Sequence, residues 1–152
     1  MELCKFHFCK FSFKRIMKYL LTFCCVLIFT NCDAQVKIAP SYNGLYHTLS
    51  DTLNPFRFYL RFYPEGDVIG YTTAGDPQNL VRWFSKDHKS PTKGQYVIED
   101  TVISFTLKSE QGLVDYHGTI LPDNRMFLHI KSLINKYEGK ETYFFWPVNG
   151  LK

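Results

Sequence analysis

Apolar and polar residues alternate from Pro55 to Tyr63, and this alternation is the clearest structural signal in the chain. The apolar row is Phe56, Phe58, Leu60 and Phe62, and the other row is Arg57, Tyr59, Arg61 and Tyr63. Because successive side chains of a strand point to opposite faces, the pattern predicts a half-buried strand. Pro64-Glu65-Gly66 then predicts a tight turn, so that Asp67–Thr73 returns as an antiparallel partner.

Six further segments rich in β-branched and aromatic residues follow or precede this hairpin at short, regular spacing. They are Leu45–Leu49, Gly94–Glu99, Thr101–Lys108, Leu113–Leu121, Arg125–Ser132 and Glu141–Trp146. Between the third and fourth strands, Asp76 and Pro77 are typical of a helix start, and Pro77–Phe84 is expected to form a helix of about two turns. The predicted order is therefore eight strands with one short helix.

A meander of eight strands either closes into an up-and-down barrel or splits into a sandwich. Closure removes the exposed sheet edges and suits hairpins that follow one another without long crossovers. The sequence therefore predicts an all-β, eight-stranded antiparallel barrel.

The row Phe58, Leu60 and Phe62 either lines an apolar cavity in this barrel or fills its core. The interior of an eight-stranded barrel is just wide enough for side chains or one small ligand, and a row this bulky favours filling. Trp83 and Phe84 on the short helix are expected to plug one end of the barrel.

The start of the chain has the order of an export signal, in which a basic stretch precedes an apolar one. Lys14, Arg15 and Lys18 precede the 12-residue apolar run 19–30, which is shorter than the roughly 20 residues that span a bilayer. A cleaved signal peptide is therefore expected. Translation begins either at Met1, with a long basic region, or at Met17.

The sequence permits cleavage of this signal at either of two sites. Cutting after Ala34 releases a soluble protein that begins at Gln35, whereas Phe29-Thr30-Asn31-Cys32 resembles an imperfect lipobox in which Cys32 takes the lipid. The predicted organisation is a signal region at 1–34, a tether at 35–43 and a single β-domain at 44–152. We expect an exported protein, periplasmic or secreted in the first case and membrane-anchored in the second.

All five cysteines lie upstream of Asp33, so we expect no disulfide and no thiol chemistry in the β-domain. The leader also carries 5 of the 18 Lys and Arg residues and 2 of the 14 Asp and Glu residues, so the net charge of +4 falls to +1 without it. A nearly neutral domain without a basic cluster does not predict a nucleic-acid partner.

The residues with acid–base or metal chemistry to offer are His47, Asp115, Tyr116, His117 and His129. Asp115 and His117 are two apart on one predicted strand and face the same side, which permits a two-ligand metal site or an oriented base. The alternative is a set of polar residues facing solvent. Spacing demands no third ligand and no serine has a nucleophile-elbow context, so we predict no metal, no cofactor and no enzyme activity.

Arg57 and Arg61 lie on the face opposite the Phe row, beside Tyr59 and Tyr63. Their planar guanidinium groups and the neighbouring rings would recognise an anionic or carboxylate-headed ligand. The alternative is an outer strand face on which arginine stems cover tyrosine rings.

The β-domain resembles small exported lipocalin-like (calycin-type) proteins of Bacteroidetes type. Gly44-Leu45-Tyr46, the hairpin 59–69, Gly94-Gln95-Tyr96 and the segment 102–105 carry the likeness, although true lipocalins have Gly-x-Trp at the first of these. The hairpin, with Thr72-Thr73 and an acid–Pro helix start, is also similar to the C-terminal β-domain of some F-box proteins. The resemblance implies the barrel fold and no catalytic residues.

These observations together predict an exported, non-catalytic binding protein for a small apolar or amphipathic ligand. The residues expected to line the site are Phe58, Leu60, Phe62, Arg57, Arg61 and Tyr59. The alternative is a structural or protein-interaction module of the cell envelope, anchored through a lipid on Cys32.

Overall fold

The computed structural model of the chain describes residues 38–50, 54–89 and 92–151. The strands are β1 (Gly44–His47), β2 (Arg57–Phe62), β3 (Asp67–Thr73), β4 (Thr92–Glu99), β5 (Val102–Ser109), β6 (Gly112–Ile120), β7 (Met126–Ser132) and β8 (Glu138–Pro147). One helix, η1 (Pro77–Phe84), lies between β3 and β4.

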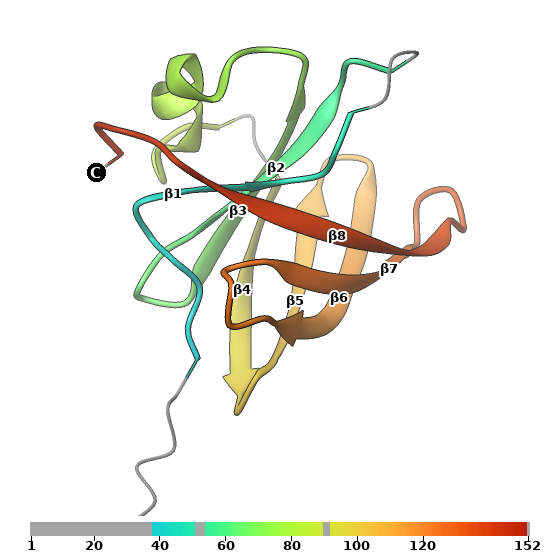
Figure 1. Cartoon of the computed structure of the whole chain (residues 1–152). Coiled ribbons are helices and arrows are strands. Elements are labelled where there is room, and N and C mark those ends of the chain that lie inside the picture. Colours follow the sequence, from blue (N-terminus) through green and yellow to red (C-terminus); the bar gives the residue numbers. More distant parts are fainter. Residues whose placement is uncertain (1–37, 51–53, 90–91, 152) are drawn as a thin grey trace, which may run out of the picture. The chain divides into compact units, whose positions relative to one another are not determined.

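The strands form a closed antiparallel barrel in which each strand pairs with its neighbours in sequence and β8 pairs with β1 (Figure 1). This confirms the predicted fold class, and the arrangement is consistent with a lipocalin-like fold. The predicted hairpin of β2 and β3 is present, and its register runs from Arg57 opposite Thr73 to Phe62 opposite Val68. The chain therefore forms the barrel from consecutive hairpins and closes it with the β1–β8 pairing.

Several element ends differ from the prediction. β1 ends at His47, and β2 begins only at Arg57, so Phe56 precedes the strand and is 57% exposed. β8 begins at Glu138, three residues earlier than expected, because its pairing with β7 continues to Lys131. The helix has the predicted bounds but is a 3-10 helix, and the Asp76 side chain accepts a hydrogen bond from the Gln78 amide at 2.8 Å. No helix among the described residues is long and apolar enough to cross a membrane.

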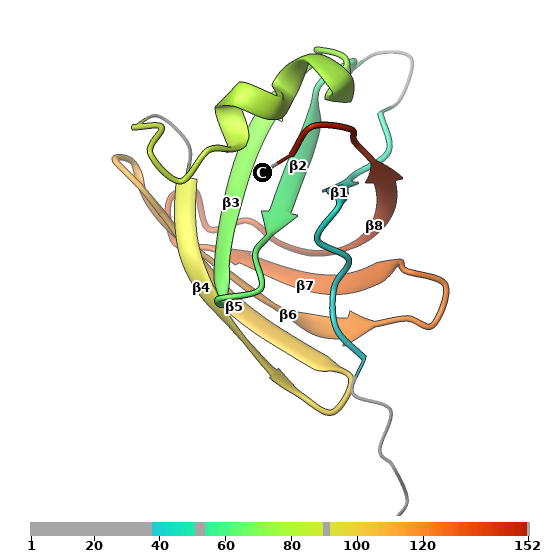
Figure 2. The same cartoon turned by 90° about the vertical axis from the view of Figure 1, so that its left-hand side faces the viewer.

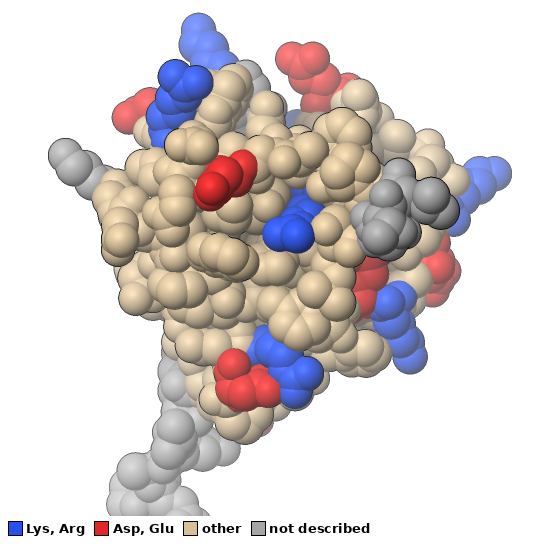
Figure 3. All heavy atoms as spheres, turned by 45° about the horizontal axis from the view of Figure 1, so that its top comes forward, with Lys and Arg blue, Asp and Glu red and all other residues tan. Residues whose placement is uncertain are grey.

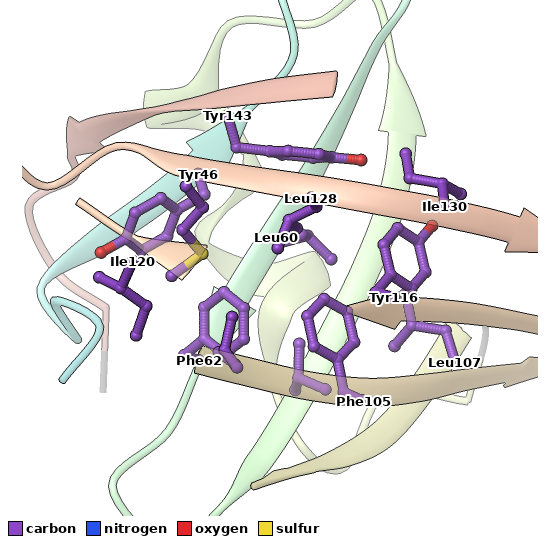
Figure 4. Packing of buried hydrophobic residues seen from close by; sticks show 13 residues of the cluster. Tyr46, Leu60, Phe62, Phe105, Leu107, Tyr116, Ile120, Leu128, Ile130 and Tyr143 are labelled. Carbon is purple, nitrogen blue, oxygen red and sulfur yellow. The ribbon is translucent and has the colours of Figure 1, made fainter. Parts of the chain in front are cut away.

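The barrel encloses a continuous core of aliphatic and aromatic side chains (Figure 4). Its fully or nearly fully buried members include Tyr46, Leu60, Phe62, Ile103, Met126, Leu128 and Tyr143. Tyr46 and Phe62 meet edge to face with ring centroids 5.6 Å apart, as do Phe62 and Phe105 at 5.5 Å. The middle of the barrel is thus packed with side chains.

A second apolar cluster lies outside the barrel, between the outer face of β2 and β3 and the helix that covers it (Figure 2). Phe84 is fully buried there against strand residues such as Tyr59 and Ile69. The prediction that Trp83 and Phe84 plug one end of the barrel is therefore wrong. Tyr59, Ile69 and Tyr71 supply the apolar part of the outer wall of β2 and β3, and the helix packs on it.

One end of the barrel is closed by the segment that precedes β1. Ile38 and Tyr42 pack against the inner core, and the Tyr42 hydroxyl lies 3.2 Å from that of Tyr96. The Ser41 amide donates to the Tyr46 hydroxyl at 2.8 Å, and the Ser41 hydroxyl donates to Asn124 in the β6–β7 turn at 3.0 Å. Inside the barrel, room for a ligand is therefore expected at the opposite end.

Candidate ligand site at the mouth of the barrel

The open end of the barrel, which we call the mouth, holds a recess of about 1010 Å³. The apolar residues that line it are Phe58, Leu107, Val114, Tyr116 and Ile134. Thr72 and Thr92 add hydroxyl groups, and the Thr92 hydroxyl donates to the Gly70 carbonyl at 2.9 Å. This volume is slightly above the upper end of the roughly 300–1,000 Å³ range of small-molecule sites. The lining combines the apolar side chains with polar and charged ones, among them Lys89, Ser109, Glu110 and Gln111.

A stack of three rings separates the recess from the packed core. Tyr116 lies parallel to Phe105, with ring centroids 4.6 Å apart and an interplanar angle of 8°. Phe58 faces Tyr116 with centroids 6.2 Å apart and an angle of 4°. Phe58 is half-buried whereas Tyr116 is buried, so the outer end of the stack remains accessible from the mouth.

Tyrosine hydroxyls and one carboxylate are also directed into the barrel interior. Tyr143 and Tyr116 project from opposite walls with their hydroxyls turned toward the same end (Figure 4). Glu141 shares the inner face of β8 with Tyr143, because it pairs with the buried Leu128. The Tyr137 hydroxyl donates to Glu141 Oε1 at 3.2 Å.

Electrostatics connects Glu141 with all three of these tyrosines. Burial raises the pKa of Tyr116, and the negative charge of Glu141 raises it further. Burial is also the main cause of the raised pKa of Tyr143, to which Tyr116 and Glu141 contribute. For the exposed Tyr137, the charge of Glu141 is the first cause of a raised pKa.

The predicted apolar row is divided between two environments. Phe58 lies at the mouth, whereas Leu60 and Phe62 are completely buried in the core. The row therefore fills the barrel over most of its length, and its first residue borders the recess.

The predicted Arg57, Tyr59 and Arg61 lie on the outer wall. Arg61 is only 4% exposed, and its Nη1 donates to the Phe84 carbonyl at 2.8 Å. The same carbonyl accepts the Tyr63 hydroxyl. Burial lowers the pKa of Arg61, and Tyr63 partly offsets this. Arg61 thus holds the end of η1 on the barrel.

Arg57 lines a different recess, of about 460 Å³, on the outer wall. Its Nε donates to the Ser50 hydroxyl at 3.0 Å, and Asp76 borders the same recess. Arg57 and Arg61 share one strand face, but η1 covers only the second. The structure does not bring the two guanidinium groups together with Phe58.

Of the predicted acid–base residues, Asp115, His117 and His129 lie on the outer face of β6 and β7, whereas Tyr116 faces the barrel interior. His117 pairs in register with His129, and Asp115 lies two residues from His117 on the same face. The Thr106 hydroxyl donates to Asp115 at 2.7 Å, while His117 Nδ1 lies 2.8 Å from the Ser104 hydroxyl. Asp115 therefore bonds a threonine and does not orient the imidazole.

His129 and His47 have partners of other kinds. His129 Nε2 lies 3.1 Å from a Glu138 carboxylate oxygen, and His47 is buried among rings with Nδ1 2.8 Å from the Thr48 carbonyl. Within the described ranges, no three His, Cys, Asp or Glu residues are grouped to hold a metal ion. Cys32 and both cleavage sites lie outside the described residues.

Charged side chains on the surface are dispersed over the face shown in Figure 3, where blue and red groups lie among a larger tan area. Three of the four ion pairs found among the described residues lie in or next to loops and turns. Lys86 pairs with Glu65 and with Asp67, and Arg125 pairs with Asp123. The face shown in Figure 3 therefore carries charges of both signs.

Sequence reasoning missed most of the mouth. The predicted strands contain Leu107, Val114 and Tyr116, and the alternation of apolar residues is enough to predict that these side chains face inward. Their closeness to Phe58, however, depends on the closure of the barrel. Glu141 is the first residue of the predicted last strand, so no preceding strand residues show by alternation which face it belongs to. Its neighbours Tyr143 and Phe144 are both aromatic, so the pattern does not reveal the inner face.

Comparison with known proteins adds no relative to this description. No protein-family model, no curated protein and no solved structure matches the chain.

Proposed function

We propose that the protein is an exported, non-catalytic binding protein for a small amphipathic ligand, which it holds in the mouth of the barrel. The observation that carries the proposal is the recess of about 1010 Å³ beside the half-buried Phe58. A concave site that combines apolar and aromatic walls with a small number of polar groups is the usual form of a small-molecule site. The packed middle of the barrel limits the ligand to the mouth.

The proposal also follows from the position of the accessible aromatic surface. Phe58 and Tyr116 present ring surface to the recess, and burial of apolar area contributes about 25 cal/mol per Å² to binding before the cost of association. A ligand with an apolar body gains from this surface. Its polar part would remain near the rim, where loops and solvent meet.

Blocking the recess tests the proposal. In the Val114→Trp variant the larger side chain occupies the inward-facing position next to Leu107. We expect its affinity for the neutral fluorescent probe N-phenyl-1-naphthylamine to be at least ten times lower than that of the original protein. Fluorescence titration gives both dissociation constants.

Val97→Trp is the matched control, because Val97 faces outward on β4 and is 62% exposed. It should bind the probe with an unchanged constant. If Val114→Trp does not fold, Ile134→Trp replaces it, since Ile134 borders the same recess and is already 43% exposed. Equal binding by the blocked and control variants would refute a site at the mouth.

The export part of the proposal, and the likeness to small Bacteroidetes-type proteins, depend on the leader. The basic stretch before the apolar run 19–30 supports it. Mass spectrometry of the mature N-terminus should find either an unmodified start at Gln35 or an acylated Cys32. A mature protein that still begins at Met1 or Met17 would contradict export by cleavage.

A further inference from the structure

Glu141 is an exception to the chemistry of the barrel interior. Inward-facing strand positions are identified by their pairing with buried core residues, and Glu141 pairs with Leu128. Among the strand residues that the structure describes, it is the single charged residue at an inward-facing position. A charge inside a largely apolar enclosure is unfavourable unless something pairs with it.

The described part of the chain supplies Glu141 with a hydroxyl and no cation. The Tyr137 hydroxyl donates to it at 3.2 Å, and none of the ion pairs found among the described residues includes it. A tyrosine hydroxyl satisfies one acceptor position of a carboxylate, which has about four. Glu141 is half-buried, and it lies three residues after the start of β8 at Glu138. The turn that precedes β8 contains Ile134, which lines the recess.

The rim is shaped so that Tyr137 reaches this carboxylate. Position 139 lies between them on the inner face of β8, and it is glycine. A Cβ atom there would lie 2.3 Å from the Tyr137 hydroxyl oxygen. The missing side chain at position 139 therefore leaves room for the Tyr137 ring, whose hydroxyl reaches Glu141 from the residue just before β8.

Positive charges contribute to the recess lining through Lys89, Lys93 and Lys108. Lys93 and Lys108 contribute to the recess lining but occupy outward-facing positions opposite each other on β4 and β5. The Lys93 ammonium group donates to the Lys86 carbonyl, in the loop after η1. The interior charge is thus negative, while these lysines face the outer surface.

We propose that the mouth selects a cationic ligand, an amine with an apolar body, and that Glu141 is its counter-ion. An ammonium group can donate hydrogen bonds to the carboxylate and can lie against the ring of Tyr137. Such cation–π contacts add to the attraction when the site is partly desolvated. The apolar body occupies the recess beside Phe58. The inference rests on the proposed function, since it names the class of ligand for the same site.

Three naphthalene probes of similar size and different charge test the inference. They are 1-naphthylmethylamine, 1-naphthalenemethanol and 1-naphthaleneacetate, each titrated calorimetrically into the purified protein. We expect the amine to bind at least ten times more tightly than the alcohol, and the acetate to bind most weakly, because its charge has the same sign as that of Glu141.

Glu141→Gln keeps the size and an acceptor for Tyr137 but removes the charge. It should weaken amine binding at least tenfold and leave alcohol binding unchanged. Glu138→Gln is the matched control: Glu138 lies on the same strand, pairs with Lys131 and faces outward. It removes the same charge from the molecule and should alter amine binding less than twofold.

The outcomes separate the two proposals. Equal binding of amine and alcohol, tighter binding of the acetate, or equal effects of Glu141→Gln and Glu138→Gln would overturn the role of Glu141, while alcohol binding that Val114→Trp abolishes would still support the site. No binding of any probe would overturn both. Thermal unfolding of each variant verifies that the substitution leaves the fold intact.

Discussion

Replacing Phe84 by alanine is expected to lower the free energy of unfolding by about 3–5 kcal/mol, the range for a buried phenylalanine truncated to alanine. Phe84 is fully buried between η1 and the outer wall, where it packs with Tyr59, Ile69 and Leu80. The loss comes from the apolar transfer of the ring and from the cavity that it leaves. The midpoint of thermal unfolding should fall by roughly 10–20 °C.

Phe127→Ala is the control for this prediction, because Phe127 faces outward on β7 and is 45% exposed. Its loss should stay within about 1 kcal/mol, as for most surface substitutions. Urea unfolding, monitored by tryptophan fluorescence, gives both values. Similar losses for the two variants would mean that η1 is not seated on the barrel as described.

The second large effect is expected at Gly118 on the inner face of β6. A Cβ atom built there would lie 2.0 Å from the Phe127 carbonyl oxygen and 2.8 Å from the Leu128 Cα. Both are backbone atoms of the paired strand, so the strand itself must shift, and overpacking of this kind destabilises by roughly 1–3 kcal/mol or more. We expect Gly118→Ala to lose about 3 kcal/mol or to fail to accumulate as folded protein.

Two further substitutions make this test specific. Gly94→Ala should behave similarly, because a Cβ atom there would lie 2.0 Å from the Thr106 carbonyl oxygen. Gly75→Ala should change stability by no more than about 0.5 kcal/mol, since Gly75 is exposed and the atom nearest to an added Cβ is the side-chain oxygen of Thr73, at 3.3 Å. A fully stable Gly118→Ala variant would show that β6 and β7 do not approach so closely.

Alternation and turn chemistry were enough to predict the barrel. The hairpin of β2 and β3 follows directly from the rows around Phe58 and Arg57, and its register agrees with the pattern. Such patterns depend on neighbours in sequence, and in an up-and-down barrel nearly every pairing joins neighbours in sequence. This is why a local signal could predict the fold.

The outer wall was harder to predict. Alternation shows that Tyr59 and Arg61 share a face, but it does not show what covers that face. Tyrosine and arginine suit both solvent and a covering helix, because each has an apolar body and a polar end. Contact with Phe84, more than twenty residues away, decides the question.

The mouth was the least predictable part, because its residues come from strands on different sides of the barrel. Phe58 on β2 and Tyr116 on β6 face each other only when the sheet closes. Glu141 gave no signal, since a glutamate at a strand end is common on surfaces. The pairing of Glu141 with Leu128 shows that Glu141 faces inward, and this pairing cannot be predicted from the sequence alone.

The pairing of β8 with β1 makes the order of the strands cyclic. Val148 donates its amide to the Asn43 carbonyl at 3.1 Å, so the chain leaves the barrel beside the point where it enters. A circular permutant of the barrel domain could therefore join positions next to Asn43 and Val148 by a short linker and begin at the turn between β4 and β5, which faces away from the mouth. Every strand would keep both neighbours, so the barrel should form from a chain that starts at a different strand.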